Sequence, residues 1–320
     1  MAAGRPSTAP EPGCAPVSKP RFECIPNFSE GRRPEVLARI RRAAEAAGVQ
    51  ILDFEADPDH NRSVLTLAGD AEPLLSAVQR TMTVAVDTID LTRHQGTHPR
   101  IGAVDVVPFV PLDDTPMEEA VALAHRLGAW AGTQLGLPVF FYEAAALHAD
   151  RRNLADVRRG QFEGLAVRLG KHPPDVGPAA PHPLAGAVAI GARRPLIAFN
   201  VYLTTDDLAI ARAVARAVRA SSGGLPGVKA LAMDTRRSRG QVQVSMNLVD
   251  YTTTPLPIVL ERVRAESRAR GTDVASTELV GLMPAQAVED VMQHYIALQD
   301  FRWHRVLEAA LREGDWDERG

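Results

Sequence analysis

Residues 49–69 read VQILDFEADPDHNRSVLTLAG. Two runs rich in apolar and β-branched residues, 49–56 and 63–69, flank the polar sequence DPDHNR. Such runs favour strands, and the Asp, Pro and Asn residues between them are typical of a turn. The stretch therefore predicts two adjacent strands joined by a polar turn.

Helical patterns lie on both sides of this strand pair. Apolar residues recur at helical spacing in residues 34–47, and a second helix is predicted from about residue 70 to residue 89. Strand-like segments lie outside the helices, at residues 21–28 and 103–111. The resulting order is β-α-β-β-α-β, which is the ferredoxin-like arrangement.

The second half of the chain repeats this order. Its elements are predicted at residues 195–203 (strand), 205–219 (helix), 228–234 and 241–251 (strands), 257–268 (helix) and 274–281 (strand). A closing helical region is predicted at residues 284–312. Between the halves, residues 171–186 hold five prolines and predict an extended linker.

These patterns predict an α+β protein of two tandem ferredoxin-like (β-α-β-β-α-β) subdomains with a groove between them. Residues 1–20 are rich in Pro, Ala, Gly and Ser, which predicts a disordered N-terminal tail. The N-terminal subdomain is expected at residues 21–180 and the C-terminal subdomain at residues 181–320.

The composition excludes several functional classes. The formal charge is 36 − 39 = −3, so no overall positive charge indicates binding to nucleic acid or to an anionic membrane. No apolar run approaches the ~20 residues of a membrane span. Only two cysteines are present, which fits a reducing cytoplasm. Zinc-ligand spacings and the GxGxxG, Walker, HExxH and GxSxG motifs are absent, so no metal is predicted.

Three polar clusters stand out, at residues 26–31 (PNFSEG), 55–63 (EADPDHNRS) and 93–100 (RHQGTHPR). Each has an ordinary interpretation as a turn, and Ser29 in particular could cap the following helix. The third cluster has the strongest functional signal. His98 stands at the entrance to a strand, and a histidine can take and return a proton near neutral pH. In an extended segment Arg100 would project to the same side, where it could bind a carboxylate.

Five ordered segments carry a resemblance to a known family: ECIPNFSEG (23–31), DHNRSV (59–64), RHQGTHPRIGAVDVVPFVP (93–111), GARRPLIAFNVYL (191–203) and VSMNLVDY (244–251). At this order and spacing they resemble the glutamate formimidoyltransferase family, over about residues 23–284. The resemblance implies two ferredoxin-like subdomains, a homodimer, and tetrahydrofolate as co-substrate. It also implies transfer of the formimidoyl group from N-formimidoyl-L-glutamate to N5 of tetrahydrofolate, a step of histidine degradation and one-carbon metabolism.

The resemblance also implies roles for single residues. His98, in the triplet His98-Pro99-Arg100, is the expected general acid/base, with Arg100 and His94 as further catalytic candidates. The predicted substrate-binding residues are Arg62, Asn27, Asp53, Glu55 and Asn200. The predicted folate-binding segment comprises Gly177, Pro178, Ala179, Ala180, Pro181, His182, Pro183, Leu184, Ala185 and Gly186. Glu55 stands where the family has an aspartate that assists the histidine, and the folate segment is unusually rich in Ala and Pro.

Alternative functions remain open. The donor could be formylglutamate or 5-formyltetrahydrofolate, and the acceptor could be a different amine. A non-catalytic folate-binding or scaffold protein is an alternative from another class. The joint presence of His98, Arg100 and Arg62 argues against it, because a pure binding protein has no need of a proton shuttle.

Overall fold

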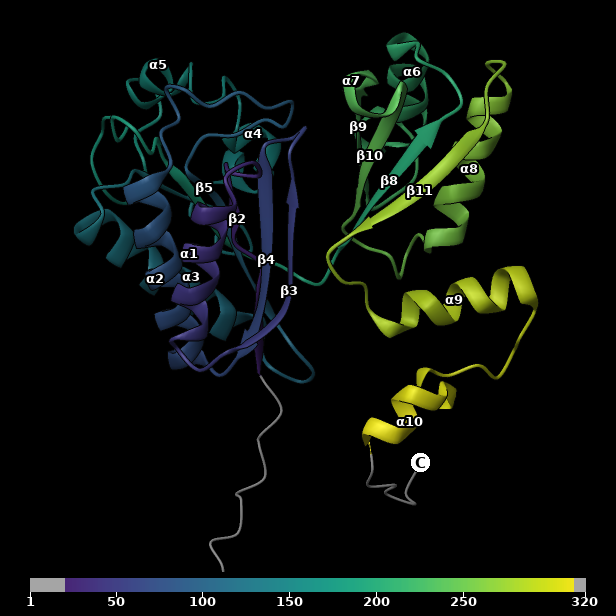
Figure 1. The fold of residues 1–320 in the computed structure, drawn as a ribbon, viewed down its shortest axis with the longest axis horizontal. Coiled ribbons are helices and arrows are strands. Elements are labelled where there is room, and N and C mark those ends of the chain that lie inside the picture. Colours follow the sequence, from purple (N-terminus) through teal and green to yellow (C-terminus); the bar gives the residue numbers. More distant parts are fainter. Residues whose placement is uncertain (1–20, 314–320) are drawn as a thin grey trace, which may run out of the picture.

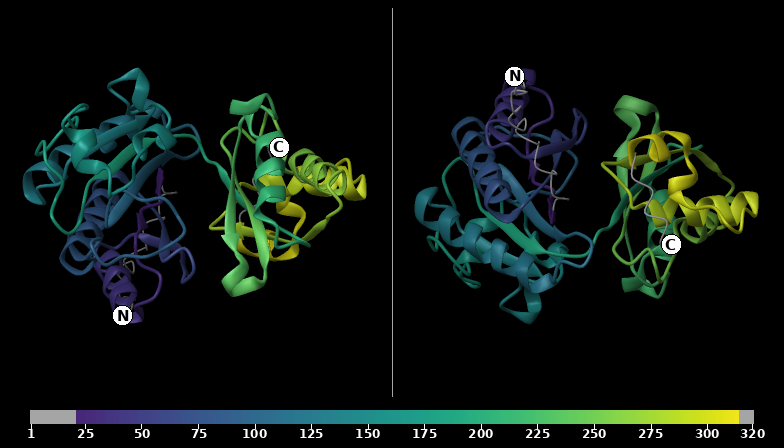
Figure 2. Two further views of the ribbon diagram at one scale, coloured as in Figure 1. Left: turned by 90° about the horizontal axis from the view of Figure 1, so that it is seen from above. Right: turned by 90° about the horizontal axis from the view of Figure 1, so that it is seen from below.

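The computed structural model describes residues 21–313, so the predicted tail over residues 1–20 lies outside the described part. The chain forms two α+β subdomains placed side by side, joined by an extended segment near residue 195 (Figures 1 and 2). Each contains one sheet and its own hydrophobic core. The two predicted subdomains are therefore present.

The first sheet is built from the strands β1 (Phe22–Cys24), β2 (Asn27–Phe28), β3 (Gln50–Asp57), β4 (Arg62–Gly69), β5 (Val104–Pro111), β6 (Val139–Glu143) and β7 (Val188–Ala192). Its first five strands are antiparallel neighbours, with β4 between β3 and the β1–β2 segment, and β5 beyond that segment. With the helices α1 (Pro34–Glu45) and α2 (Ala71–Thr88) they give the predicted β-α-β-β-α-β unit. Together with α3 (Met117–Gln134), these helices lie on the side of the sheet that faces away from the second subdomain (Figure 1).

Strand β7 extends the first sheet beyond the predicted boundary at residue 180. Its five residues pair in parallel with β6, and four of them pair in parallel with β5. These residues were expected in the second subdomain, and no strand was predicted for them. The first subdomain therefore continues through Ala192.

The second sheet contains β8 (Ile197–Leu203), β9 (Val228–Thr235), β10 (Gln241–Leu248) and β11 (Val274–Val280), in the order β11-β8-β10-β9. All three pairings are antiparallel, as expected of a ferredoxin-like unit. The main helices are α6 (Leu208–Val218) and α8 (Leu256–Arg268), which bury Val214, Val218, Val259 and Val263 in the core.

The remaining elements of the described chain are η1 (Ala149–Arg151), α4 (Leu154–Val157), α5 (Leu165–Leu169), η2 (Ala220–Ser222), α7 (Arg236–Arg239), α9 (Ala285–Ile296), η3 (Trp303–Arg305) and α10 (Leu307–Glu313). The predicted closing helix is thus broken into pieces. Ala297 adopts the left-handed region at φ 57°, which ends α9. Within residues 21–313, no helix is both long and apolar enough to cross a membrane.

Candidate active site

A cavity of about 810 Å³ lies between the two subdomains. On the first sheet, alternate residues of the β1–β2 segment, β4 and β5 line it, as the period of a β-strand requires. These residues are Glu23, Ile25 and Asn27 on β1–β2, Arg62, Val64 and Thr66 on β4, and Val106 and Pro108 on β5. Because the helices cover the opposite face, polar side chains on this face remain available to a ligand.

The second sheet supplies the facing wall. Ala198 and Asn200 of β8, Ser245 and Asn247 of β10, and Glu278 and Val280 of β11 line the cavity. The side-chain carboxylate of Glu55, on the first sheet, accepts a hydrogen bond of 3.0 Å from the backbone N–H of Gly281 in the second subdomain. A cavity of this size and mixed polarity suits an organic ligand.

The three polar clusters of the sequence meet at one end of the first sheet. Asn61 joins them: its Oδ1 accepts from the Gly31 backbone N–H at 3.0 Å, and its Nδ2 donates to the Gln95 carbonyl at 3.1 Å. Its own carbonyl accepts from Nε2 of His94 at 2.9 Å. Ser29 also belongs to this assembly, because its hydroxyl donates to the carbonyl of Gly102 at 2.7 Å. The expectation that Ser29 caps α1 is therefore wrong.

Gly96 brings the loop of residues 93–98 directly against the turn of residues 57–62. A Cβ at this position would lie 2.2 Å from the backbone carbonyl oxygen of His60. We expect Gly96→Ala to destabilise the protein by ~1–3 kcal/mol, because a backbone atom cannot move aside without shifting the turn. Thermal unfolding measures the effect. Gly170→Ala is the matched control, since its Cβ would approach no atom closer than 3.6 Å, and an equal loss of stability in both variants would contradict the prediction.

His98 lies half-buried in the cavity wall. Its Nδ1 is 2.8 Å from the carbonyl oxygen of Pro99. A carbonyl oxygen only accepts, so Nδ1 must carry the proton, and in the neutral ring Nε2 is then left with a free lone pair. This is the tautomer that a general base requires.

The surroundings of His98 favour its neutral form. Burial holds the pKa of His98 well below its ordinary value of 6.5, and the positive charges of Arg62 and Arg158 lower it further. The carboxylate of Asp105 and the carbonyl of Pro99 oppose this shift without cancelling it. His98 is therefore an unprotonated base at neutral pH.

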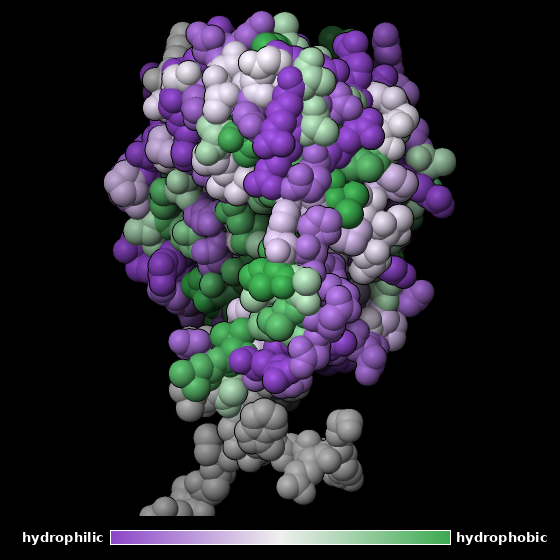
Figure 3. Space-filling model, turned by 90° about the vertical axis from the view of Figure 1, so that its right-hand side faces the viewer, coloured by the Kyte–Doolittle hydropathy of each residue, from purple (hydrophilic) through white to green (hydrophobic). Residues whose placement is uncertain are grey.

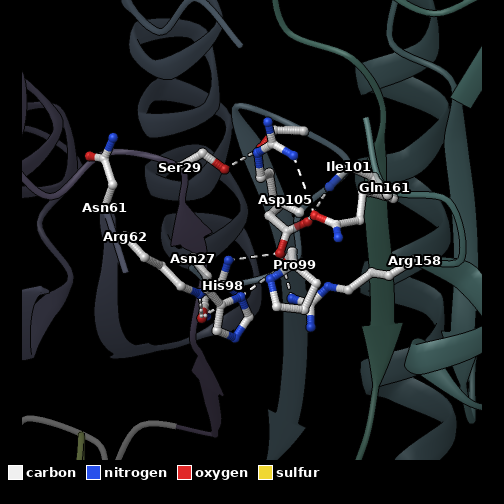
Figure 4. Close-up of polar contacts among 12 residues, drawn as sticks. Asn27, Ser29, Asn61, Arg62, His98, Pro99, Ile101, Asp105, Arg158 and Gln161 are labelled. Atoms are coloured by element: carbon white, nitrogen blue, oxygen red, sulfur yellow. Dashed lines mark hydrogen bonds and ion pairs between the residues drawn. The ribbon is translucent and has the colours of Figure 1, made fainter. Parts of the chain in front are cut away.

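Asp105 is the fully buried anion beneath this site. It accepts hydrogen bonds from Arg62 Nη1 at 2.7 Å, from the backbone N–H of Ile101 at 2.8 Å, and from Arg158. Figure 4 shows the two guanidinium groups reaching Asp105 from two sides. Burial would raise the pKa of Asp105, but the two arginines outweigh burial and hold it far below its ordinary value.

A β-bulge turns Asp105 inward. Asn27 pairs with Val106 and Phe28 pairs with Val104, so Asp105 is the extra residue in β5. Its carboxylate thereby reaches Arg62, whose Nε and Nη2 also donate to Asn27 Oδ1 at 3.2 and 2.9 Å. The predicted substrate residues Arg62 and Asn27 do line the cavity, but they also bind one another.

Arg100 and His94 do not reach the cavity. Arg100 is buried and forms a two-pronged ion pair with Glu163, at 2.9 and 2.7 Å. Its Nε donates to Nδ1 of His94 at 3.1 Å. The expectation that Arg100 projects to the same side as His98 is wrong, because regular strand structure begins only at Val104. Both residues hold the loop that carries His98.

Of the three remaining residues that were predicted to bind substrate, two line the cavity and one does not. Glu55 and Asn200 line the cavity, from opposite subdomains. Burial raises the pKa of Glu55, and the nearby charges of Asp53 and Glu278 act in the same direction. Asn200 donates to Glu278 Oε2 at 3.1 Å. Asp53 is not among the lining residues, although its Oδ2 is buried without a hydrogen-bond partner.

The predicted folate-binding segment, residues 177–186, contributes no residue to the cavity wall. It forms a loop behind the His98 loop, where Gly186 bridges to both Gly102 and His182. Nδ1 of His182 accepts the backbone N–H of Ala185 at 2.9 Å. Gly186 has φ 71°, and a Cβ there would lie 2.2 Å from the carbonyl oxygen of Ile101. The segment supports the loop that carries His98 from outside.

Several cavity residues were missed by the sequence analysis: His60, Tyr142, Arg158, Arg193, Arg239 and Glu278. Asp105 was missed as well, although a charged residue within the apolar run VDVVPF was a usable signal. The cavity residues converge from two halves of the chain, and local patterns carry no information on that convergence. Among residues 21–313, no group of three or more His, Cys, Asp and Glu side chains is arranged to hold a metal ion.

Comparison with known proteins places the chain in a family. A family model described as "Formiminotransferase domain, N-terminal subdomain" matches residues 21–193, and one described as "Formiminotransferase domain" matches residues 198–308. Glutamate formimidoyltransferase of Streptococcus pyogenes serotype M1 is 42% identical over 89% of this chain and 96% of its own length. The protein of the same name from Thermoplasma acidophilum is 44% identical, over 91% and 97%.

A longer relative matches only in part. Formimidoyltransferase-cyclodeaminase of Gallus gallus is 39% identical over 86% of this chain, and the match covers 52% of that protein. The two family models follow the two subdomains of the fold, and each of the two shorter relatives is matched over nearly its whole length. The chain therefore belongs to the formiminotransferase family.

Proposed function

We propose that this protein is a glutamate formimidoyltransferase, which transfers the formimidoyl group of N-formimidoyl-L-glutamate to N5 of tetrahydrofolate. The observation that carries the proposal is His98, a neutral base of defined tautomer in the wall of a cavity between two subdomains. The names of the relatives at 42% and 44% identity support the same reaction.

The charges of the cavity fit these substrates. The donor carries two carboxylates and the folate carries a glutamate tail, while Arg193 and Arg239 lie in the cavity wall on different subdomains. Arg62 and Arg158 are already paired with Asp105, so we assign them to the environment of His98. Carboxylate binding then falls to Arg193 and to Arg239, as charge-assisted hydrogen bonds. Arg239 now pairs with Glu278 at 3.2 Å, but this pair is solvent-exposed and can be exchanged for a substrate carboxylate.

The chemistry requires two proton transfers. N5 of tetrahydrofolate attacks the formimidoyl carbon, and Nε2 of His98 takes the proton that N5 must lose. The departing glutamate nitrogen gains a proton when its bond to the carbon breaks. Holding both substrates in one cavity supplies much of the remaining rate enhancement, since well-oriented reactants can gain ~7–11 kcal/mol.

The direct test is an assay of the purified protein with formimidoylglutamate and tetrahydrofolate, which follows 5-formimidoyltetrahydrofolate and released glutamate. We expect equal amounts of both products. Formylglutamate, tested in parallel, is expected to be a poor donor. If formylglutamate is the better substrate, then it is the donor in place of formimidoylglutamate. If the protein binds folate but transfers no group, then it is a folate-binding protein and not a transferase.

The pH profile tests the environment of His98. Because the base must be neutral and its pKa lies well below 6.5, kcat/KM should hold as the pH falls through 6.5 and decline only below it. Arg158→Gln removes a positive charge beside His98, which raises the pKa of His98 and moves the decline to higher pH. Arg126→Gln, which removes an exposed cation, is the control and should leave the profile unchanged. A wild-type decline centred above pH 6.5 would contradict this assignment.

We further propose that the enzyme is a cytoplasmic homodimer. The described C-terminal segment exposes large apolar side chains, namely Tyr295, Ile296, Leu298, Trp303 and Leu307. Figure 3 shows apolar side chains gathered on the lower part of this face of the molecule. Such a patch supports association with a second copy. Sedimentation analysis tests the proposal, and a monomer at micromolar concentration would contradict it.

A further inference from the structure

A second histidine, His60, lies in the wall of the same cavity. Its Nδ1 is 2.7 Å from Oδ2 of Asp57, and 11% of its side chain is exposed. Burial would raise the pKa of Asp57, but hydrogen bonds from His60 and from the backbone of the turn outweigh it and hold this pKa at about 2. Asp57 is therefore an anion at neutral pH and accepts the Nδ1 proton, which leaves Nε2 as the atom that exchanges protons.

His60 and His98 form a pair of fixed geometry. Their ring centroids are 6.1 Å apart, and the rings stand at 76° to one another. The hydrogen bonds of Asn61 tie the turn that carries His60 to the loop that carries His98. A proton donor or acceptor must come within ~3 Å of its partner atom. A reacting carbon bound in the cavity beside both rings would thus have the two imidazoles within reach of its substituents.

The two rings have different electrostatic surroundings. His98 lies beside the guanidinium groups of Arg62 and Arg158, whereas His60 is hydrogen-bonded to the carboxylate of Asp57. Such a carboxylate orients an imidazole and stabilises the positive charge that the ring takes on with a second proton. Differences of this kind separate the acid from the base in an active site. A protonated His60 with its Asp57 carries no net charge, so the pair does not repel a cationic formimidoyl group.

We propose that His60 is the general acid of the transfer and donates its Nε2 proton to the departing glutamate nitrogen, while His98 acts as the base. The inference rests on the proposed function. Once N5 has bonded to the formimidoyl carbon and given its proton to His98, the carbon holds both nitrogens. His60 then protonates the glutamate nitrogen, whose bond to the carbon breaks with the electron pair remaining on that nitrogen.

The proposed steps conserve protons and electrons without any further reactant. A lone pair of the remaining formimidoyl nitrogen restores the double bond to the carbon as glutamate leaves. At this point His98 holds one additional proton and His60 lacks one, and exchange with solvent returns both rings to their starting states. Asp57 stays ionised throughout and acts as a positioning residue for His60.

The test compares three variants of the full chain with the wild type: His60→Ala, Asp57→Asn and the control His172→Ala, whose side chain is exposed and lies outside the cavity wall. We expect His60→Ala to lower kcat by ~10²-fold or more, with the KM for tetrahydrofolate unchanged. Added imidazole should restore part of this activity, because it fits the vacated space and can donate a proton. Pyrazole has the same size but is a much weaker base, so it should not.

Asp57→Asn retains the Oδ1 acceptor of the turn and removes the charge, so we expect a smaller fall in kcat in a variant that still folds. Its melting temperature should be lower than that of the wild type, because the depressed pKa of Asp57 means that its charge stabilises the folded state. Wild-type kcat in His60→Ala would overturn the inference and leave the proposed function standing, whereas an inactive wild type would overturn both. Equal effects of imidazole and pyrazole would assign His60 a structural role and also overturn it. If His60→Ala does not fold, Asp57→Asn decides, and a wild-type kcat in that variant overturns the inference.

Discussion

Replacement of His98 by glutamine is expected to lower kcat by ~10²–10⁴-fold, the range associated with loss of a general base. Glutamine can still donate a hydrogen bond to the Pro99 carbonyl, as Nδ1 of His98 does at 2.8 Å. It cannot accept and release a proton near neutral pH. The loss should therefore appear in kcat, measured under saturating substrates, and the affinity for tetrahydrofolate should stay close to that of the wild type.

His94→Gln is the matched control for this prediction. His94 lies in the same loop, but it hydrogen-bonds to Asn61 and Arg100 and does not line the cavity. Its replacement should lower the melting temperature, while kcat stays close to that of the wild type. Activity within ~3-fold of wild type in His98→Gln would be too small a loss for a general base, and it would remove His98 from the mechanism.

The overall architecture could be predicted because each subdomain is built from neighbouring elements in sequence. The strand pair β3–β4 is a hairpin, and its flanking helices carry regular apolar faces. Strand β7 could not be predicted in the same way. It follows the proline-rich segment directly, and it is a strand because it pairs in parallel with β5 and β6, which lie far away in the sequence.

The site could be predicted only where one short segment carried the signal. His98 was found because proline, glycine and histidine cluster just before an apolar strand, and the structure places it in the cavity wall. Arg100 was expected beside it on the assumption of an extended backbone, but residues 98–101 are irregular. The inward direction of the Asp105 side chain depends on a bulge, whose position is set by the pairing of β5 with β2. A bulge shifts the inward-outward alternation of a strand, so the sequence alone does not give this direction.

The second large effect is expected from Asp105→Asn, which should destabilise the protein by ~3–5 kcal/mol, because it leaves two buried cations without their anion. Arg62 and Arg158 both donate to Asp105, and the side chains are only 9% and 13% exposed. Asparagine preserves the shape and one acceptor oxygen, so the loss reports on charge. Equilibrium unfolding in urea measures the change in the free energy of unfolding.

Two comparisons make this prediction specific. Glu72→Gln removes the anion of an exposed pair with Arg126, and it should leave the free energy of unfolding close to that of the wild type, because solvent screens such a pair. Adding Arg158→Gln to Asp105→Asn removes one of the two buried cations that have lost their anion. The double variant should therefore be more stable than Asp105→Asn alone, which a double-mutant cycle measures. Simple additivity of the two single losses would mean that the three groups do not act as one network. In that case the low pKa of His98 could not be attributed to this cluster, and burial alone would have to account for its neutral ring.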